Sequence, residues 1–306
     1  MPDDLTDVHD ALANLPHLAA IPETDRRLTR LGGLTNRVYR AETSAGTVIV
    51  RIAGVGTDDY IDRAVELHNA HAAAAAGVSP EVLWADAATG VMITRSLDPI
   101  TTMTPDQFAS RSGSPGRAGA ALARLHGSGR EFRFRFELFA MIDDYLGILA
   151  GRNTELPEGY HDIARAAAPV KAALAANPAP LAPCHCDPLC ENFLDDGKRM
   201  WIVDWEYSGM NDPLWDLGDL SVEAGFGADQ EAEMMHAYFG RAPEAAETAR
   251  MVIYKAMCDL LWTLWGLIQH ADGNPAEDFW AYATGRFDRC KALMRSDAFA
   301  AHLAAL

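Results

Sequence analysis

The feature that most constrains the fold of this chain is a turn in its second half. The sequence Asp-Asp-Gly-Lys at 195–198 lies between two short apolar segments, 193–194 and 200–203. Apolar segments joined by such turn residues are typical of a β-hairpin. The hairpin would place Asn192 and Asp204, which flank these segments, on neighbouring arms.

The polar residues around this hairpin have the spacing of a phosphoryl-transfer site. Asp187 precedes Asn192 by five residues, and Asp204 follows Asn192 by twelve. A divalent cation that bridges nucleotide phosphates takes hard oxygen ligands from one or two side chains, and an Asn amide and an Asp carboxylate supply them. Asp187 stands where kinases carry the residue that orients the attacking hydroxyl and accepts its proton. The pattern predicts a site for ATP and Mg²⁺, with Asp187 as base and with Asn192 and Asp204 as metal ligands.

Other interpretations of this segment stay open from the residues alone. Cys184, His185, Cys186 and Cys190 could form a zinc site, although the usual two pairs of ligands at fixed spacing are missing. His185 is more simply a structural core histidine. Asp216, which stands between apolar residues, is expected to bind loop backbone rather than to catalyse.

Two longer segments resemble a known family. The sequence HCDPLCEN at 185–192 is similar to the catalytic loop of the aminoglycoside phosphotransferase and choline kinase superfamily, and 202–226 is similar to the choline and ethanolamine kinase signature. The resemblance covers nearly the whole chain and points to the choline kinase branch. It implies an α+β, bilobal, protein kinase-like fold, with a small antiparallel β-sheet N-lobe that has one main helix and a larger, mainly helical C-lobe. The implied domains are residues 1–97, which bind the nucleotide, and residues 98–306, which carry out catalysis and bind the substrate.

The N-terminal third has the pattern of an antiparallel sheet. Three short β-type runs between residues 28 and 52 are separated by glycine-containing turns. The first turn, at 32–36, would let backbone N–H groups approach phosphate oxygens, but it is equally consistent with a simple hairpin. The family has a similar segment there, which implies that Gly33, Thr35 and Asn36 contact the nucleotide.

Arg51 is a cation within an apolar strand. Burial of such a charge is costly unless a carboxylate pairs with it. A helix is predicted over about Tyr60 to Ala76, and Glu66 within it is the candidate partner. The resemblance implies that Arg51 contacts nucleotide phosphates and pairs with this acid. The alternative is that Glu66 is one more exposed helix charge.

The rest of the chain is expected to be mainly helical, with one Ala-rich helix over 162–176 and another over Met251 to His270. Trp262 and Trp265 fall on one face of the latter helix, and tryptophans at this spacing usually belong to a core. The family has a matching pair whose rings face a quaternary ammonium, and a cation above an aromatic ring gains about 0.5 to 2 kcal/mol. The resemblance implies that four residues bind the substrate: Glu223, Trp262, Trp265 and Tyr282.

Composition favours an ordinary cytoplasmic enzyme. The 306 residues carry a formal net charge of -17, with a pI near 4.9, which argues against nucleic acid as a partner. Five cysteines without framework spacing indicate a reducing compartment. The first residues lack the pattern of a signal peptide, and the most apolar helix candidate contains Lys255 and Asp259, so membrane insertion is not expected. A homodimer is an open expectation.

Together these features predict an ATP-dependent phosphotransferase that phosphorylates the hydroxyl of a small amino alcohol. Choline, converted to phosphocholine, is the leading hypothesis. Ethanolamine or another small alcohol is the nearest alternative substrate, and an aminoglycoside is a more distant one. A nucleotide-binding pseudokinase is the alternative from another class, and substrate-dependent release of ADP separates it from a kinase.

Overall fold

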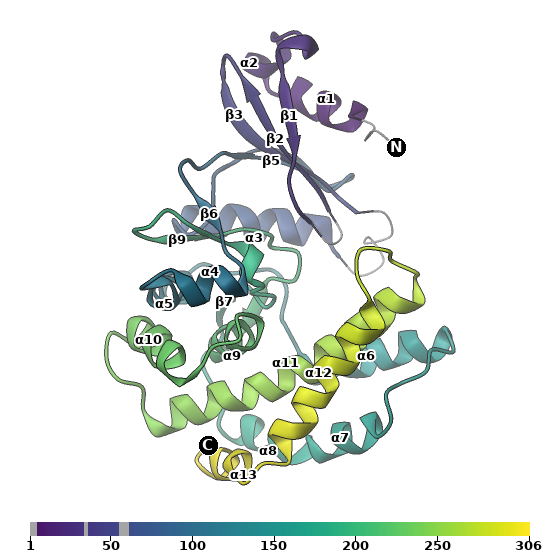
Figure 1. The fold of residues 1–306 in the computed structure, drawn as a ribbon, viewed down its shortest axis with the longest axis vertical. Helices are drawn as coiled ribbons and strands as arrows, with labels where there is room; N and C mark the ends of the chain where they lie inside the picture. Colours follow the sequence, from purple (N-terminus) through teal and green to yellow (C-terminus); the bar gives the residue numbers. More distant parts are fainter. Residues whose placement is uncertain (1–4, 34–35, 55–60) are drawn as a thin grey trace.

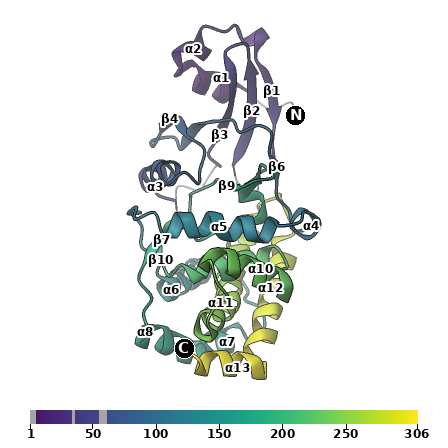
Figure 2. The same cartoon turned by 90° about the vertical axis from the view of Figure 1, so that its left-hand side faces the viewer.

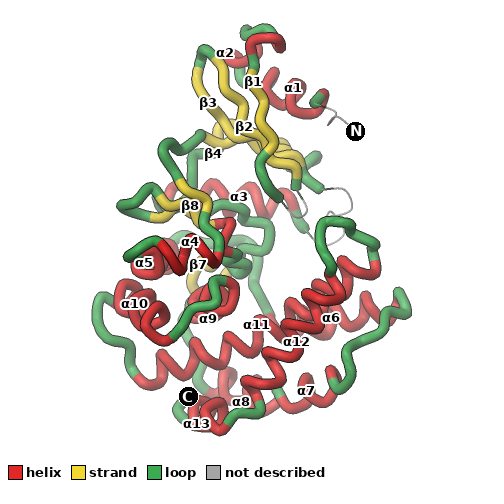
Figure 3. Tube along the Cα trace, viewed as in Figure 1, coloured by secondary structure: helices red, strands yellow, loops and turns green. Residues whose placement is uncertain are grey.

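A five-stranded antiparallel sheet forms one end of the molecule, and helices fill the other end (Figures 1 and 3). The structure is a computed structural model that describes residues 5–33, 36–54 and 61–306. The predicted α+β architecture, with a small antiparallel sheet and a larger helical part, is confirmed.

The sheet has the strand order β1-β2-β3-β5-β4, and every neighbouring pair is antiparallel. The strands are β1 (Arg27–Arg30), β2 (Arg37–Thr43), β3 (Gly46–Ile52), β4 (Val82–Asp86) and β5 (Val91–Arg95). In β3, Val48, Val50 and Ile52 are buried, as expected for alternate residues of a strand that face a core. Arg51 therefore points to the opposite face of the sheet.

Helices cover both faces of this sheet. On the side of Val48 and Val50, α1 (Thr6–Ala13) and α2 (Pro16–Ala19) pack with the strands in one apolar cluster. On the side of Arg51 lies α3 (Arg63–Ala75), below the sheet in Figure 2. The main N-lobe helix predicted from the sequence is present as α3.

The remainder of the chain is mainly helical. Its helices are α4 (Pro105–Ser110), α5 (Ser114–His126), α6 (Leu138–Gly151), α7 (Tyr160–Ala166), α8 (Ala168–Ala176), α9 (Leu214–Glu223), α10 (Ala228–Phe239), α11 (Ala245–Ala271), α12 (Phe279–Met294) and α13 (Asp297–Ala304). Two small sheets accompany them: β6 (Thr101–Thr102) with β8 (Phe193–Asp195) and β9 (Met200–Ile202), and β7 (Ala182–Cys184) with β10 (Gly209–Asn211). The chain leaves the first sheet between β5 and β6, where the predicted boundary between residues 97 and 98 falls. The division into two domains stays a prediction.

One helix was predicted wrongly. The segment 162–176 was expected to form a single helix, but the structure has two, α7 and α8, which meet at Ala167. Pro169 lies in the first turn of α8. Because proline has no backbone N–H to donate to the preceding turn, the first helix cannot continue through it.

The centre of the helical part is α11, whose 27 residues are mostly buried. It packs against α6, α9, α12 and α13. Among the described residues it is the one helix long and apolar enough to cross a membrane, but 83% of its most apolar window is buried inside the fold. Its apolar character is accounted for by its place in the core.

Candidate active site

The predicted hairpin is present, and it brings two candidate metal ligands together. β8 and β9 form its arms, and beyond them the backbone N–H of Val203 donates to the carbonyl of Asn192 at 3.0 Å. The next residue, Asp204, has a φ of 68°. This left-handed conformation costs a residue other than glycine about 1 to 3 kcal/mol, and such strain is concentrated at functional sites.

The loop that carries Asp187 is fixed by hydrogen bonds to α9 and to the hairpin. The carboxylate of Asp216 accepts hydrogen bonds from the backbone N–H groups of His185, at 2.7 Å, and Cys186, at 2.8 Å. The side-chain amide of Asn192 donates to the carbonyl of Asp187 at 3.1 Å. Because its nitrogen is engaged, the amide oxygen of Asn192 is the atom available to a cation. The backbone-binding role predicted for Asp216 is confirmed.

His185 has a structural place, as predicted. It is fully buried, its Nε2 lies 2.9 Å from the carbonyl oxygen of Val203, and its ring packs against Trp205. Burial lowers the pKa of His185, which favours the neutral ring. In the part of the chain that the structure describes, His185 and the three nearby cysteines do not gather into a group with metal-ligand spacing, so the zinc alternative is not supported.

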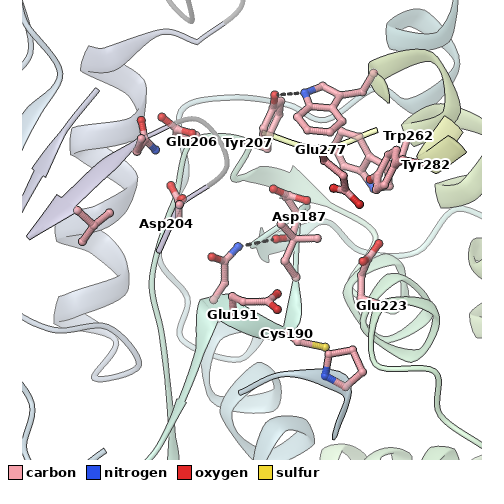
Figure 4. A pocket seen from close by; sticks show the side chains of 17 residues that line it. Asp187, Cys190, Glu191, Asp204, Glu206, Tyr207, Glu223, Trp262, Glu277 and Tyr282 are labelled. Atoms are coloured by element: carbon pink, nitrogen blue, oxygen red, sulfur yellow. Dashed lines mark hydrogen bonds between the residues drawn. The ribbon is translucent and has the colours of Figure 1, made fainter. Parts of the chain in front are cut away.

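A cavity of about 450 Å³ lies between these loops and the helices (Figure 4). Nine of the residues predicted to form the kinase site line it: Gly33, Asn36, Asp187, Asn192, Asp204, Glu223, Trp262, Trp265 and Tyr282. Figure 4 shows Asp187 near the middle, with Asp204 on one side and with Trp262 and Tyr282 on the other. The cavity thus has a carboxylate-rich side and an aromatic side.

On the carboxylate-rich side, a buried network joins two arginines to three acids. Arg51 pairs with Glu66 and lies 3.4 Å from an oxygen of Asp204. Arg63 pairs with Glu66 at 2.9 Å and also with Glu206. The partner expected for Arg51 is therefore in place, and a role of Arg51 and Glu66 in nucleotide binding stays a prediction. Neither residue lines the cavity directly.

Negative charge is crowded around Asp187 and Asp204. Burial raises the pKa of Asp187 well above its usual range, and the charges of Asp219 and Asp204 add to this effect. Burial, together with the charge of Glu206, raises the pKa of Asp204 to about 7. Carboxylates crowded in this way are stabilised by a cation. With the amide oxygen of Asn192, they form the hard oxygen donor set that Mg²⁺ prefers.

The turn after β1 contributes to the same end of the cavity. Gly33 has a φ of 145°, and a Cβ atom there would lie 2.4 Å from the carbonyl oxygen of Asn36, so only glycine fits. Asn36 is buried and accepts a hydrogen bond from the backbone N–H of Gly54 at 3.1 Å. Its Nδ2 donor has no hydrogen-bond partner in the described structure. Thr35, also predicted to contact the nucleotide, lies outside the described residues.

On the aromatic side, the two tryptophans of α11 are held by hydrogen bonds. The indole N–H of Trp262 donates to Asp219 at 3.0 Å, and that of Trp265 donates to the hydroxyl of Tyr207 at 2.9 Å. Tyr207 meets the Trp262 ring edge-on at 5.4 Å between centroids, and Tyr282 meets the Trp265 ring at 5.8 Å. Four aromatic side chains therefore line one wall of the cavity.

Glu223, predicted to be the acid of the substrate pocket, lines the cavity at the end of α9. Its carboxylate is paired with Arg286 of α12. The place of Glu223 was expected, but the cation that engages it was not, because Arg286 lies 63 residues further along the chain.

Sequence reasoning missed several residues of the site. Glu206 and Tyr207 lie two and three residues after Asp204 and belong to the same segment of family resemblance, so their position was a usable signal. Glu277 lines the cavity from the loop between α11 and α12, and no pattern in the sequence marked it. Local spacing identifies residues beside a motif but not those that packing brings to it.

Comparison with known proteins places the chain in a family. A model described as the phosphotransferase enzyme family matches residues 26–252. A solved choline/ethanolamine kinase family protein from Mesorhizobium loti is 62% identical, with a TM-score of 0.89, and the match covers 98% of this chain and 97% of that one. The chain belongs to the phosphotransferase enzyme family, and it is an ATP-dependent kinase-like enzyme. Within that family it is a member of the choline/ethanolamine kinase family.

Two further relatives are more distant. The structure of choline kinase LicA from Streptococcus pneumoniae is 26% identical, with a TM-score of 0.79, and the match covers 94% of this chain and 97% of that one. Protein LicA of Haemophilus influenzae is 28% identical over 261 residues, which are 83% of this chain and 96% of that one. The predicted bilobal, kinase-like fold is confirmed by these matches.

Proposed function

We propose that this enzyme transfers the γ-phosphoryl group of ATP to the hydroxyl of a small amino alcohol, with choline as the substrate and phosphocholine as the product. The observation that carries the proposal is the position of Asp187 in one cavity, between the oxygen donors Asn192 and Asp204 and an aromatic wall (Figure 4). The relatives named as choline kinase or choline/ethanolamine kinase support the same substrate class.

The carboxylate-rich side is the proposed place of the nucleotide. Gly33 and Asn36 line this end and offer backbone and amide donors to phosphate oxygens. Asn192 and Asp204 would hold Mg²⁺, which neutralises charge on the phosphate oxygens when it is bound. Arg51 keeps Asp204 in place through their contact and adds positive charge close to the phosphates.

Asp187 is the proposed base. Its raised pKa gives the carboxylate a high affinity for a proton, which suits the acceptance of the proton from the substrate hydroxyl. The hydroxyl oxygen then forms a bond to the γ-phosphorus as the bond from phosphorus to ADP breaks. Asp187 is left protonated, and phosphocholine and ADP are released.

The aromatic wall favours choline over ethanolamine. A quaternary ammonium has no hydrogen-bond donor, so ring faces can bind it without leaving a donor unsatisfied. A primary ammonium carries three N–H donors, which need hydrogen-bond acceptors and which ring faces satisfy poorly. Ethanolamine stays the alternative substrate. A cytoplasmic location, a homodimeric state and the absence of a nucleic-acid partner stay predictions.

A panel of small alcohols tests this proposal. We expect ADP release with Mg²⁺-ATP to be fastest with choline, slower with ethanolamine and negligible without an alcohol. Asp187→Ala should lower kcat about 100-fold to 10,000-fold, the usual share of acid–base catalysis, and leave nucleotide affinity nearly unchanged. If the enzyme preferred ethanolamine, the proposed substrate would be ethanolamine rather than choline. Binding of ATP without any alcohol-dependent ADP release would contradict the proposal.

A further inference from the structure

The acid expected to meet the substrate's positive charge, Glu223, has its own cation. Its carboxylate is paired with Arg286, whose side chain is 4% exposed. Arg286 also donates to Asp259 at 3.1 Å, and Asp259 is paired in turn with Arg289 at 2.6 Å. Two arginines and two carboxylates form this network, so their formal charges cancel.

Breaking the ion pairs of this network would be unfavourable. Removing one partner from a buried ion pair leaves an uncompensated charge in a poorly solvated place. Arg286 is held by a third contact as well, since its guanidinium lies 4.7 Å from the centroid of the Tyr282 ring. Glu223 is therefore committed to Arg286, and through Arg286 it fixes the aromatic wall on which Tyr282 lies.

A second carboxylate on the aromatic side is not committed in this way. Glu277 is exposed, lines the cavity, and makes no ion pair with any residue that the structure describes. Figure 4 shows it on the same side of Asp187 as Trp262 and Tyr282. Burial raises the pKa of the Tyr282 hydroxyl, the charges of Asp187, Asp219 and Asp259 add to this effect, and the charge of Glu277 makes a smaller contribution, so Glu277 lies within electrostatic reach of Tyr282.

We propose that Glu277, rather than Glu223, supplies the negative charge that attracts the cationic head of the substrate, while the rings beside it provide the contact. Glu223 then acts as a positioning residue through Arg286. The inference rests on the proposed function, because it concerns the cation of the same amino alcohol. A carboxylate at the open edge of the cavity suits a quaternary ammonium, which responds to charge without requiring a hydrogen bond.

The test compares choline with its neutral carbon isostere, 3,3-dimethylbutan-1-ol, which carries the same hydroxyl. At low salt, Glu277→Gln should raise the KM for choline about tenfold, leave kcat within about twofold and leave the KM for the isostere unchanged. Because Glu277 is exposed, the KM of the wild-type enzyme for choline should rise with ionic strength, and that of Glu277→Gln should not. Asp288→Asn, which removes the same charge from an exposed position of α12 outside the cavity, is the matched control.

The double variant Glu223→Gln with Arg286→Met removes the neutral pair together. We expect it to keep the preference for choline over the isostere, even if both KM values rise as the wall loosens. Loss of that preference, or an unchanged choline KM in Glu277→Gln, would overturn the inference. If the double variant does not fold, the single Glu277 variant still decides. Failure of the wild-type enzyme to use choline would instead contradict the proposed function.

Discussion

Two networks of largely buried arginines and carboxylates flank the cavity, and they differ in their balance of charge. On the nucleotide side, Arg51 and Arg63 meet three acids: Glu66, Asp204 and Glu206. On the substrate side, Arg286 and Arg289 meet two acids: Glu223 and Asp259. The first network has one carboxylate more than its arginines can neutralise, and the second is neutral.

The difference assigns different tasks to similar side chains. An excess of carboxylate is what a divalent cation stabilises, and it lies where Asp204 is expected to bind Mg²⁺. A neutral network gives little net attraction for a charged ligand but fixes the side chains that it joins. We therefore expect the charges of the first network to take part in ligand binding and those of the second network to hold side chains in position.

The largest effect is expected from the loss of one arginine in each network. Arg51→Met should destabilise the protein by about 3 kcal/mol, because a buried ion pair is broken, and it should raise the KM for ATP. Added Mg²⁺ should recover part of the lost stability, since the variant leaves three carboxylates to one arginine. Thermal melts with and without Mg²⁺ measure this recovery.

Arg286→Met is the matched variant on the substrate side. We expect a loss of stability of the same order, about 3 kcal/mol, because Glu223 is left without its cation. Mg²⁺ should recover much less of the loss here than in Arg51→Met. Equal recovery in both variants would break the comparison, because it would show that the two networks do not differ in their affinity for cations.

A smaller effect is expected at the aromatic wall. Trp265→Leu should raise the KM for choline about fivefold, since one cation–π contact of about 1 kcal/mol is lost. The KM for 3,3-dimethylbutan-1-ol should change little, because leucine keeps the wall apolar. Steady-state kinetics with both alcohols measure the two values. An equal rise for the neutral isostere would mean that the indole contributes apolar contact alone.

The smallest kinetic effect is expected from Asp219→Asn. This variant removes one carboxylate charge near Trp262 and so tests whether that charge affects choline binding. Burial raises the pKa of Asp219 from 3.8 to about 7. The folded state therefore holds its proton more tightly than the unfolded chain, and this contribution to stability is lost as the pH rises between these two values. The variant should melt above the wild type by a margin that grows from about pH 4 to pH 7 and is constant beyond it.

The choline KM of Asp219→Asn should stay within about twofold of the wild-type value, because the amide oxygen still accepts the hydrogen bond of Trp262. A rise as large as that expected for Glu277→Gln would show that Asp219 also attracts the substrate cation, and it would contradict the assignment of that task to Glu277. Melting curves across this pH range, with choline kinetics at one pH, provide both measurements.

The sequence was informative where function depends on local spacing. The turn at 195–198 predicted the hairpin, and the hairpin predicted that Asn192 and Asp204 would be neighbours. Arg51 within an apolar strand required a buried acid, and the following helix offered Glu66. In each case the relevant geometry is set within one hairpin or between one strand and the next helix, so periodicity and turn chemistry are sufficient.

Packing between distant elements decided what the sequence did not show. Arg286 reaches Glu223 because α11 packs against both α9 and α12, and no local pattern encodes that contact. Glu277 reaches the cavity because the loop between α11 and α12 runs along it. The break between α7 and α8 follows from Pro169, whose missing N–H outweighed the strong helix propensity of the surrounding alanines.

The anchoring of the Asp187 loop by Asp216 has a mechanical consequence. Through that carboxylate the loop of Asp187, the proposed base, is tied to α9, the helix that ends at Glu223, whereas Arg51, Gly33 and Asn36 belong to the sheet end of the molecule. A rotation of the sheet against the helices would therefore change the distance between the nucleotide phosphates and Asp187. It would leave the aromatic wall proposed to bind the alcohol unchanged. Access of the phosphoryl group to Asp187 would then depend on this rotation, whereas the fit of the alcohol would not.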